Sequence, residues 1–192
     1  MYINRFLEKS VLHSLDSFPV TAIIGPRQSG KSTLARYLVT KIDREILYLD
    51  LERPSDLQKL TEPEWFLSLQ KDKLICIDEI QRKPDIFPLI RSLTDEWNQN
   101  GNFLILGSAS RNLLRQSSES LAGRISYKQL TPLLWNEILP EITLEQYFER
   151  GGFPRSLLAK NLKTSSEWRL DFITTFLERD LLQWSGFTPS VM

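Results

Sequence analysis

The stretch TAIIGPRQSGKSTLARYL, residues 21–38, constrains the fold of this 192-residue chain more than any other segment. A short apolar run stands directly before a polar loop bounded by glycines, and an apolar pattern of helical period follows the loop. The loop from Gly25 to Ser32, here called the phosphate loop, matches the pattern G-x-x-x-x-G-K-[ST]. That pattern is specific when a strand precedes it and a helix follows it. The sequence therefore predicts a strand, a phosphate-binding loop and a helix in succession.

Each residue type in the phosphate loop has a task in binding a nucleotide. Glycines let backbone N–H groups approach phosphate oxygens, and the start of the following helix favours the same anion. We expect Lys31 to contact the β- and γ-phosphates of ATP, Ser32 to hold Mg²⁺ and Thr33 to contact the α-phosphate. The predicted nucleotide-binding residues are Gly25, Pro26, Arg27, Gln28, Ser29, Gly30, Lys31, Ser32 and Thr33. The alternative is a glycine-rich turn that carries Lys-Ser by chance.

Apolar runs and helical patterns alternate along the first 130 residues. We predict strands over 19–25, 44–51, 73–80, 102–110 and 124–130, and helices over 5–15, 31–42, 54–60, 63–70 and 83–101, with Gly101 as the last helix's C-terminal cap. Such alternation is typical of an α/β fold with a parallel sheet. Behind it, helical patterns over 133–150 and 164–184 flank the breaker GGFP. We therefore expect a nucleotide-binding core over 1–130 and a helical region over 131–192.

An acidic pair, Asp78 and Glu79, ends the predicted strand KLICIDEI. Ligands gather at the carboxyl ends of parallel strands, where the phosphate loop also lies, so the two sites can meet. We expect Asp78 to anchor Mg²⁺ and Glu79 to act as the general base that positions water. The alternative for Glu79 is an acid that caps the next segment. An additional strand, REILYLDL, separates the loop from the acids in sequence, an order that suits nucleotide hydrolases with a catalytic glutamate.

Serines follow the predicted strand FLILGSAS. Ser108 could lie between the γ-phosphate and Glu79 and sense which nucleotide is bound. Its alternative role, which we prefer for Ser110, is to cap a helix that starts at Arg111.

Composition limits the classes of function and the compartment. The chain has 24 basic and 24 acidic residues, so its net charge gives no support to nucleic-acid binding, although DNA remains an alternative partner. Its single cysteine, Cys76, cannot form an internal disulfide, which fits a reducing compartment. No apolar run approaches the ~18 residues that a membrane helix needs. We expect a cytoplasmic protein that does not enter the membrane.

Several motifs in order carry a resemblance to a known family: GPRQSGKST, YLDLERPSD, LICIDEIQRKPDIFPLIRSLTDE, FLILGSAS, SLAGRISYKQLTPL and GGFPRSLLA…WRLDFITTFLERDL. Nearly the whole chain resembles the prokaryotic AAA-type P-loop ATPases whose core precedes a C-terminal domain of unknown function. The resemblance implies a P-loop NTPase three-layer sandwich that uses ATP and Mg²⁺, with a sensor at the end of FLILGS. Such proteins usually continue well past FLERDL, so the chain is expected to be truncated within its C-terminal part.

ATPases of this kind often stabilise the transition state with an arginine, in cis or from a second copy. Arg124, in SLAGR, is the first candidate, and its loop is expected on the nucleotide side of the sheet. Arg111, Arg115 and Arg155 are its rivals. An arginine acting in trans would require a homo-oligomer. Besides an ATPase, three functions stay open: a nucleotide-gated regulatory module with little turnover, a P-loop kinase and a DNA-dependent ATPase.

Overall fold

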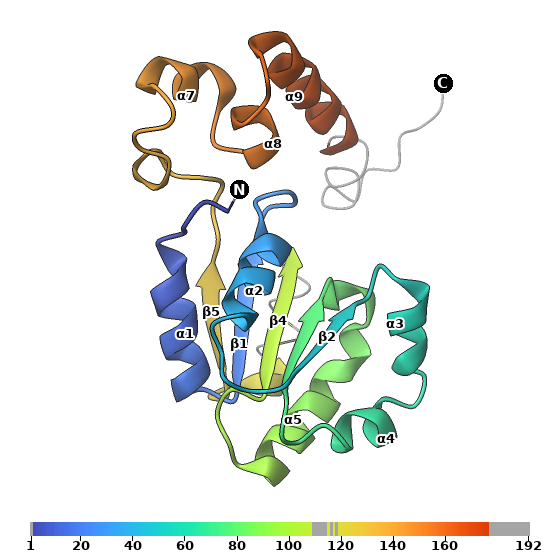
Figure 1. Ribbon diagram of the computed structural model, residues 1–192. Coiled ribbons are helices and arrows are strands. Elements are labelled where there is room, and N and C mark those ends of the chain that lie inside the picture. Colours follow the sequence, from blue (N-terminus) through green and yellow to red (C-terminus); the bar gives the residue numbers. More distant parts are fainter. Residues whose placement is uncertain (1, 109–114, 116, 118, 177–192) are drawn as a thin grey trace, which may run out of the picture. The chain divides into compact units, whose positions relative to one another are not determined.

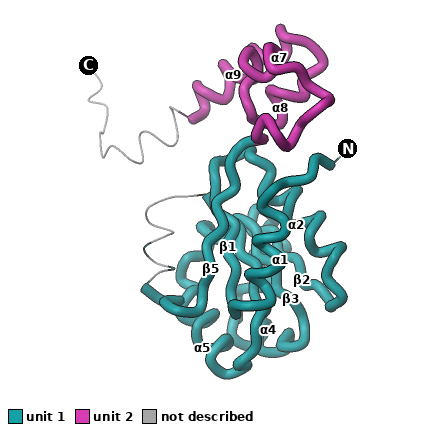
Figure 2. The backbone as a smooth tube through the Cα atoms, turned by 90° about the vertical axis from the view of Figure 1, so that its left-hand side faces the viewer, with its two compact units in different colours: residues 1–132 teal, residues 133–192 magenta. Residues whose placement is uncertain are grey.

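The computed structural model describes residues 2–108, 115, 117 and 119–176 (Figure 1). The chain divides into two compact units, residues 1–132 and residues 133–192, which Figure 2 shows in different colours. Each unit is described by itself below. Within the described residues, no helix is both long and apolar enough to cross a membrane.

Unit 1 is built on a five-stranded parallel sheet with the strand order β2-β3-β4-β1-β5. The strands are β1 (Val20–Gly25), β2 (Ile46–Asp50), β3 (Leu74–Asp78), β4 (Phe103–Ser108) and β5 (Ile125–Gln129). The helical elements are α1 (Leu7–Ser17), α2 (Lys31–Val39), α3 (Pro54–Lys59), α4 (Pro63–Ser68), the 3-10 turns η1 (Ile80–Arg82) and η2 (Pro84–Ile86), and α5 (Phe87–Trp97). The predicted α/β fold with a parallel sheet is confirmed.

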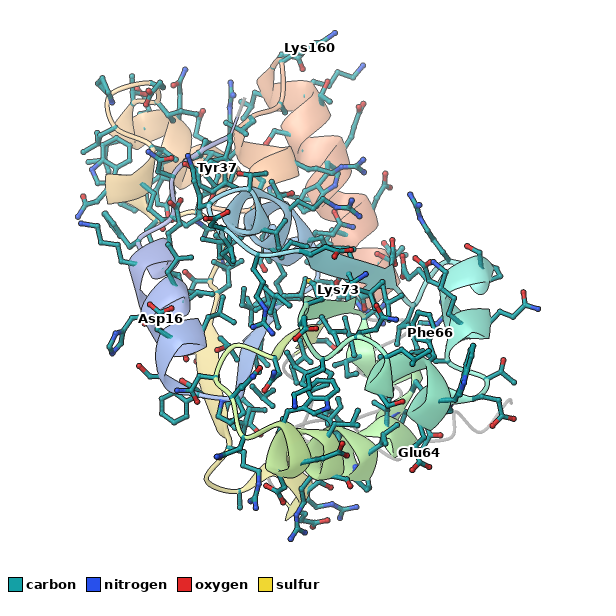
Figure 3. The ribbon with its side chains drawn as sticks, turned by 60° about the horizontal axis from the view of Figure 1, so that its bottom comes forward. Asp16, Tyr37, Glu64, Phe66, Lys73 and Lys160 are labelled. Atoms are coloured by element: carbon teal, nitrogen blue, oxygen red, sulfur yellow. The ribbon has the colours of Figure 1, made fainter. Side chains whose placement is uncertain are left out.

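Apolar residues fill both faces of this sheet, because crossover helices cover a parallel sheet on each side. The helices α1 and α2 cover one face, and α5 with part of α4 covers the other; Figure 3 labels Tyr37 of α2 and Phe66 of α4. Alternate residues of one strand therefore enter different cores. Cys76 of β3 packs on the α2 side, while its neighbour Ile77 packs on the α5 side. This arrangement gives the three layers that the sequence led us to expect.

The end of α5 differs from the prediction. The helix ends before Asn98, which has a left-handed φ of 48° and donates its backbone N–H to Thr94 O at 3.1 Å. Asparagine tolerates this conformation, so Asn98 caps the helix in place of Gly101, three residues earlier than predicted. Gly101 lies beyond the helix and donates its N–H to Phe18 O at 2.9 Å.

Unit 2 contains η3 (Trp135–Glu137), α7 (Leu144–Arg150), α8 (Pro154–Leu157) and α9 (Leu162–Phe176). The helix predicted over 133–150 is wrong in its first half, because Pro140 cannot continue a helix and Thr143 starts a new one by accepting the N–H of Gln146. GGFP breaks the helical pattern as expected, with Gly151 at a φ of 71°. The last part of the helix predicted over 164–184 lies outside the described residues.

Candidate functional site

The phosphate loop follows the carboxyl end of β1 and leads directly into α2 (Figure 1). Gln28 and Gly30 have positive φ angles of 60° and 98°, which make the backbone turn sharply. Ser29 is fully buried and donates its Oγ to Pro26 O at 2.9 Å, which closes the turn. Among the described side chains, none caps α2, and uncapped N–H groups at the start of a helix are typical binding partners of an anion. This geometry suits a phosphate group.

Lys31 lies inside the curve of the loop. Its Nζ donates to Gly25 O at 3.0 Å and to Pro26 O at 2.9 Å, and only 6% of the residue is exposed. Burial lowers the pKa of the ammonium, while the charges of Glu79 and Asp78 oppose that shift. The ammonium is thus close enough to both acids to interact with them. It is held by two neutral carbonyls that a phosphate could replace as partners.

Gly25, a predicted phosphate-binding residue, is required by packing. A Cβ atom at this position would lie 2.2 Å from Leu130 O, at the end of the segment that follows β5. The same contact region includes the hydrogen bond from Leu130 N to Ile24 O at 2.7 Å. The first glycine of the motif therefore lets β1 and the end of β5 approach each other.

Arg5 connects the phosphate loop to the segment after β5 through hydrogen bonds, a role that the sequence analysis missed. Its guanidinium donates to Ser29 O at 3.1 Å, to Thr131 O at 2.7 Å and to Pro132 O at 3.2 Å, and the residue is only 6% exposed. A Cβ on Gly30 would lie 3.7 Å from the same guanidinium. No local pattern points to this role, because Arg5 stands 20 residues before the loop in a segment that reads as an ordinary helix start.

The strand order brings the predicted site residues to one edge of the sheet. The strand β4 lies between β1 and β3, so the acidic strand is not directly beside the loop. Ser108, the last residue of β4, is the register partner of Gly25 in β1. Asp78 ends β3 at the same carboxyl edge, and Glu79 follows it. The phosphate loop, Ser108 and the acidic pair therefore succeed one another along this edge.

Asp78 is buried at the end of β3, with both carboxylate oxygens engaged. Oδ2 accepts the phenol of Tyr48 from β2 at 2.8 Å, and Oδ1 accepts the backbone N–H of Glu79 at 3.0 Å. Tyr48 itself is covered by the guanidinium of Arg36, 4.5 Å from the ring centroid. Burial, with the nearby acid, raises the pKa of the Tyr48 phenol, so it stays a donor. The orientation of Asp78 is therefore set before any ligand arrives.

Glu79 adopts a left-handed backbone with a φ of 56°, which is uncommon for a residue with a side chain. The next residue, Ile80, is fully buried and anchors the turn η1 that follows. The carboxylate accepts a hydrogen bond from Gln81 Nε2. Burial raises the pKa of Glu79, the hydrogen bond from Gln81 opposes this shift, and Asp78 adds to it. Backbone conformations of this kind gather at functional sites.

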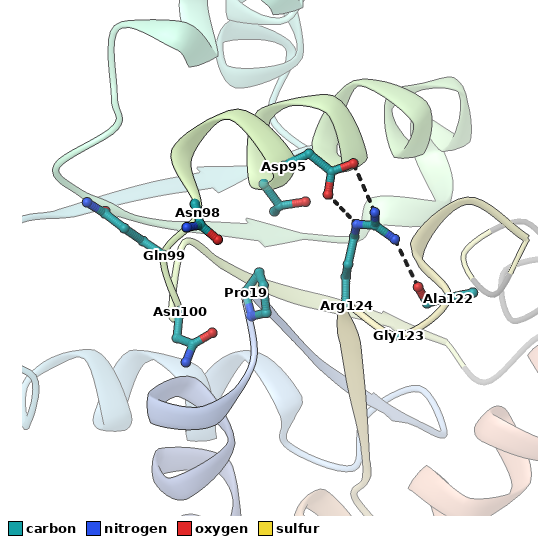
Figure 4. A pocket seen from close by; sticks show the side chains of 9 residues that line it. Pro19, Asp95, Asn98, Gln99, Asn100, Ala122, Gly123 and Arg124 are labelled. Atoms are coloured by element: carbon teal, nitrogen blue, oxygen red, sulfur yellow. Dashed lines mark hydrogen bonds and ion pairs between the residues drawn. The ribbon is translucent and has the colours of Figure 1, made fainter.

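Arg124 is not where the sequence analysis expected its loop. It directly precedes β5, and its carbonyl accepts the N–H of Val20, the first residue of β1, so it lies at the amino edge of the sheet. The guanidinium pairs with Asp95, with Nη2 3.0 Å from Oδ2, and also donates to Ala122 O at 3.1 Å (Figure 4). These groups line an open polar pocket of about 530 Å³. The reason for the error is the direction of the chain: a residue that enters a parallel strand lies a strand length, about 17 Å, from the edge that holds the loop.

The rival arginines are distributed over both units. Arg115 lies in unit 1 with its Nε 3.9 Å from Glu119 Oε1, and Arg155 is exposed on α8 of unit 2. Arg111 and Ser110, for which we predicted a helix cap, lie outside the described residues. A role of any of these arginines in trans stays a prediction.

The donors at the carboxyl edge fit a magnesium ion and a polyphosphate. Ser32 is half-buried in the first turn of α2, and Asp78 offers a carboxylate already oriented by Tyr48. Hydroxyl and carboxylate oxygens are the ligands that Mg²⁺ takes in such sites. We therefore keep Ser32 and Asp78 as the predicted metal-binding residues.

Comparison with known proteins identifies the family. The model of the family described as "AAA domain" matches residues 17–139, which is more than half of the chain. Uncharacterised proteins of Mycobacterium tuberculosis and Mycobacterium bovis are each 44% identical over 177 residues, which cover 92% of this chain but 39% of theirs. An uncharacterised protein of Methanocaldococcus jannaschii is 23% identical over 210 residues, 94% of this chain and 45% of that protein. The chain thus spans less than half the length of these relatives.

A solved structure supports the same conclusion at the level of the fold. The chain is similar to a Walker-type ATPase of Pyrococcus abyssi with a TM-score of 0.64 and 16% identity, over 98% of this chain and 77% of that one. Because the identity is this low, the structural comparison shows only a similar fold. The family assignment comes from the match of the sequence to the family model. Together with the phosphate loop and the order of its strands, these findings show that the chain belongs to the AAA domain family of P-loop ATPases.

Proposed function

We propose that this protein binds ATP with Mg²⁺ at the carboxyl edge of its sheet and hydrolyses it to ADP and phosphate. One observation carries the proposal: Lys31 is buried inside the phosphate loop, and the strand order brings Asp78 and Glu79 to the same carboxyl edge of the sheet. A turn that carried Lys-Ser by chance would not need these acids beside it. The family match and the likeness to a Walker-type ATPase support the same reading.

Phosphate binding would begin with an exchange of partners at Lys31. The ammonium would leave the carbonyls of Gly25 and Pro26 and turn to the β- and γ-phosphate oxygens, which are stronger acceptors because they are charged. The N–H groups of the loop and of the α2 start would surround the same oxygens. Ser32 and Asp78 would hold Mg²⁺, which, when bound, supplies neutralisation of phosphate charge.

Hydrolysis would depend on Glu79. Its carboxylate would orient a water molecule toward the γ-phosphorus and accept the proton that the water loses as it attacks. Burial raises the pKa of this carboxyl toward the range in which a general base is effective at neutral pH. Ser108, beside the loop, would contact the γ-phosphate and report whether it is present.

The test is phosphate release from ATP and Mg²⁺ over a range of protein concentrations, for the wild type and two variants. Lys31→Ala should weaken ATP binding about 10- to 100-fold, because a charged hydrogen-bonding partner of the phosphates is removed. Glu79→Gln should keep ATP binding and lower turnover by about 10²- to 10⁴-fold, because the proton acceptor is lost. If Glu79→Gln turned over ATP at the wild-type rate, the hydrolytic role of this site would be wrong.

A second measurement addresses partners. If the protein is an ATPase and Arg124 completes the site of a second copy, the rate of phosphate release per molecule rises with protein concentration. Mixing Lys31→Ala with Arg124→Ala would then restore turnover, since each variant would provide what the other lacks. ATP binding without turnover would instead favour the nucleotide-gated module. Transfer of phosphate to an added acceptor would favour a kinase. Stimulation of phosphate release by DNA would favour a DNA-dependent ATPase.

A further inference from the structure

The turn η1 places Gln81 directly against the predicted catalytic carboxylate. Glu79 leaves β3 with a left-handed backbone, and Ile80 enters the core, so the chain reverses sharply within three residues. The backbone carbonyl of Glu79 accepts the N–H of Arg82 at 3.0 Å, which closes this turn. Gln81 Nε2 then donates to Glu79 Oε2. The side chain of Gln81 is therefore held by the turn and by the carboxylate together.

The other half of the same amide has no partner. Gln81 Oε1 is buried, and none of the described groups donates a hydrogen bond to it. The amide cannot be reversed to cure this, because a carboxylate only accepts hydrogen bonds and so requires the nitrogen to face it. Leaving a buried carbonyl-type oxygen without a donor costs about 1–3 kcal/mol. Such an atom in a native protein calls for an explanation, and a bound water is the simplest donor.

The position of η1 indicates where that water would lie. The turn contacts β4, the strand between the acidic strand and the phosphate loop. The last residue of β4, Ser108, is the register partner of Gly25 at the start of the loop. The turn that carries Gln81 therefore packs against the strand whose last residue lies beside the start of the phosphate loop.

We propose that Gln81 is a positioning residue for hydrolysis: its Nε2 holds the Glu79 carboxylate, and its Oε1 accepts a hydrogen bond from the attacking water. This inference rests on the ATPase function proposed above. In the step, the water oxygen forms a bond to the γ-phosphorus, and one water proton passes to Glu79. The bond from the γ-phosphorus to its bridging oxygen breaks, and its electron pair stays on ADP. Gln81 gains and loses no proton; the second water proton, which its Oε1 accepts as a hydrogen bond, remains on the product phosphate.

The experiment compares Gln81→Met with the wild type, since methionine keeps the length of the side chain and removes both polar atoms. The readouts are kcat for phosphate release, the dissociation constant of ATP with Mg²⁺ and the melting temperature. We expect kcat to fall about 10- to 100-fold, because a water molecule that is misplaced by up to about 1 Å reacts more slowly by such a factor. The ATP dissociation constant should stay within about twofold, because Gln81 does not belong to the phosphate loop. Gln70→Met is the matched control, since the Gln70 side chain lies after α4 and donates to a backbone oxygen, Phe66 O, at 3.4 Å.

Each other outcome overturns the inference in a recognisable way. If Gln81→Met keeps kcat while Glu79→Gln abolishes it, hydrolysis by Glu79 stands and the role of Gln81 falls. If Gln81→Met loses ATP affinity and melting temperature together with kcat, Gln81 is a structural residue of the turn. If the wild type binds ATP and neither it nor Glu79→Gln releases phosphate at any protein concentration, the ATPase function fails first and the positioning role fails with it.

Discussion

Two arginines, one near each edge of the sheet in unit 1, bind three backbone carbonyls each, yet their surroundings differ. Arg5 is buried behind the phosphate loop at the carboxyl edge. Arg44 is half-exposed at the amino edge, where it donates to Asp72 O, Gly101 O and Lys71 O at 2.9, 2.9 and 3.1 Å. Arg44 thus ties together the segments that enter three strands. Arg5 instead ties a loop of ligand-binding form to the segment that leaves β5.

The same contrast holds for the other charged groups at the two edges. At the amino edge, Arg124 and Asp95 satisfy each other in an open pocket, and exposed pairs of this kind contribute little to stability. At the carboxyl edge, Lys31 is buried and Glu79 is half-buried, and none of the described groups donates a hydrogen bond to Oε1 of Gln81, which contacts Glu79. Burying charged and polar groups with incomplete pairing is costly. The difference teaches that the charged groups at the carboxyl edge are arranged for a ligand that completes their pairing, whereas Arg124 and Asp95 at the amino edge already pair with each other.

The largest expected effect comes from removing the two arginines in turn. Arg5→Ala should lower the free energy of unfolding by about 2–4 kcal/mol, because three carbonyls, buried or partly buried, lose charged donors. It should also weaken ATP binding, since Ser29 O in the loop loses its anchor. Arg44→Ala should cost less stability and leave ATP affinity unchanged. Urea unfolding and ATP titration of both variants check this, and equal effects on ATP affinity would break the comparison of the edges.

A pair of glycine substitutions sharpens the same comparison. Gly25→Ala would bring a Cβ within 2.2 Å of Leu130 O, and Gly101→Ala would bring one within 2.9 Å of Leu15 O. Each should destabilise the protein by about 1–3 kcal/mol, because backbone atoms must move to make room. Only Gly25→Ala should also weaken ATP binding. An ATP affinity that falls equally for both would indicate a general loss of folding rather than an effect at the loop.

A smaller effect is expected from Tyr48, whose phenol orients Asp78, the predicted metal-binding aspartate. Tyr48→Phe removes the hydrogen bond to Asp78 Oδ2 and keeps the ring. The Mg²⁺ concentration needed for half-maximal turnover should rise about tenfold, as for other partners of metal ligands. Mn²⁺ binding in the presence of ATP gives an independent readout. Tyr127→Phe, which removes the hydroxyl paired with Ser117 Oγ at 2.7 Å, should leave the metal requirement unchanged.

The smallest effect belongs to the amino edge. The hydrogen bond from Arg124 holds the pKa of Asp95 below its ordinary value. Its stabilising contribution is therefore complete above the unfolded pKa of about 3.9 and disappears as the pH falls through the lower folded value. Asp95→Asn should reduce stability only slightly at pH 7, and the difference from the wild type should vanish in acid and shrink in high salt. Urea midpoints that differ as much at low pH as at pH 7 would contradict this.

Residues that act with their immediate sequence neighbours were predictable. The positions of the phosphate loop, the acidic pair and the strand before each follow from short patterns whose spacing reflects backbone geometry. Residues that act from a distance along the chain were not. Tyr48 reaches Asp78 from 30 positions away, and Arg5 reaches Thr131 from 126 positions away. Arg124 was placed at the wrong edge because a short motif does not show whether its residue enters or leaves a strand.

The sequence by itself determined that this chain has a parallel α/β unit with a phosphate loop after one strand and two acids after another, since local periodicity and turn chemistry decide these elements. Only the tertiary structure decided that β4 lies between those two strands. It also decided that Gly25 faces Leu130, that Arg5 braces the loop and that Gln81 holds Glu79. The physical reason is that these contacts depend on the order in which strands pair and on which side chains then become buried together. Those are properties of the whole packed sheet and not of any one segment.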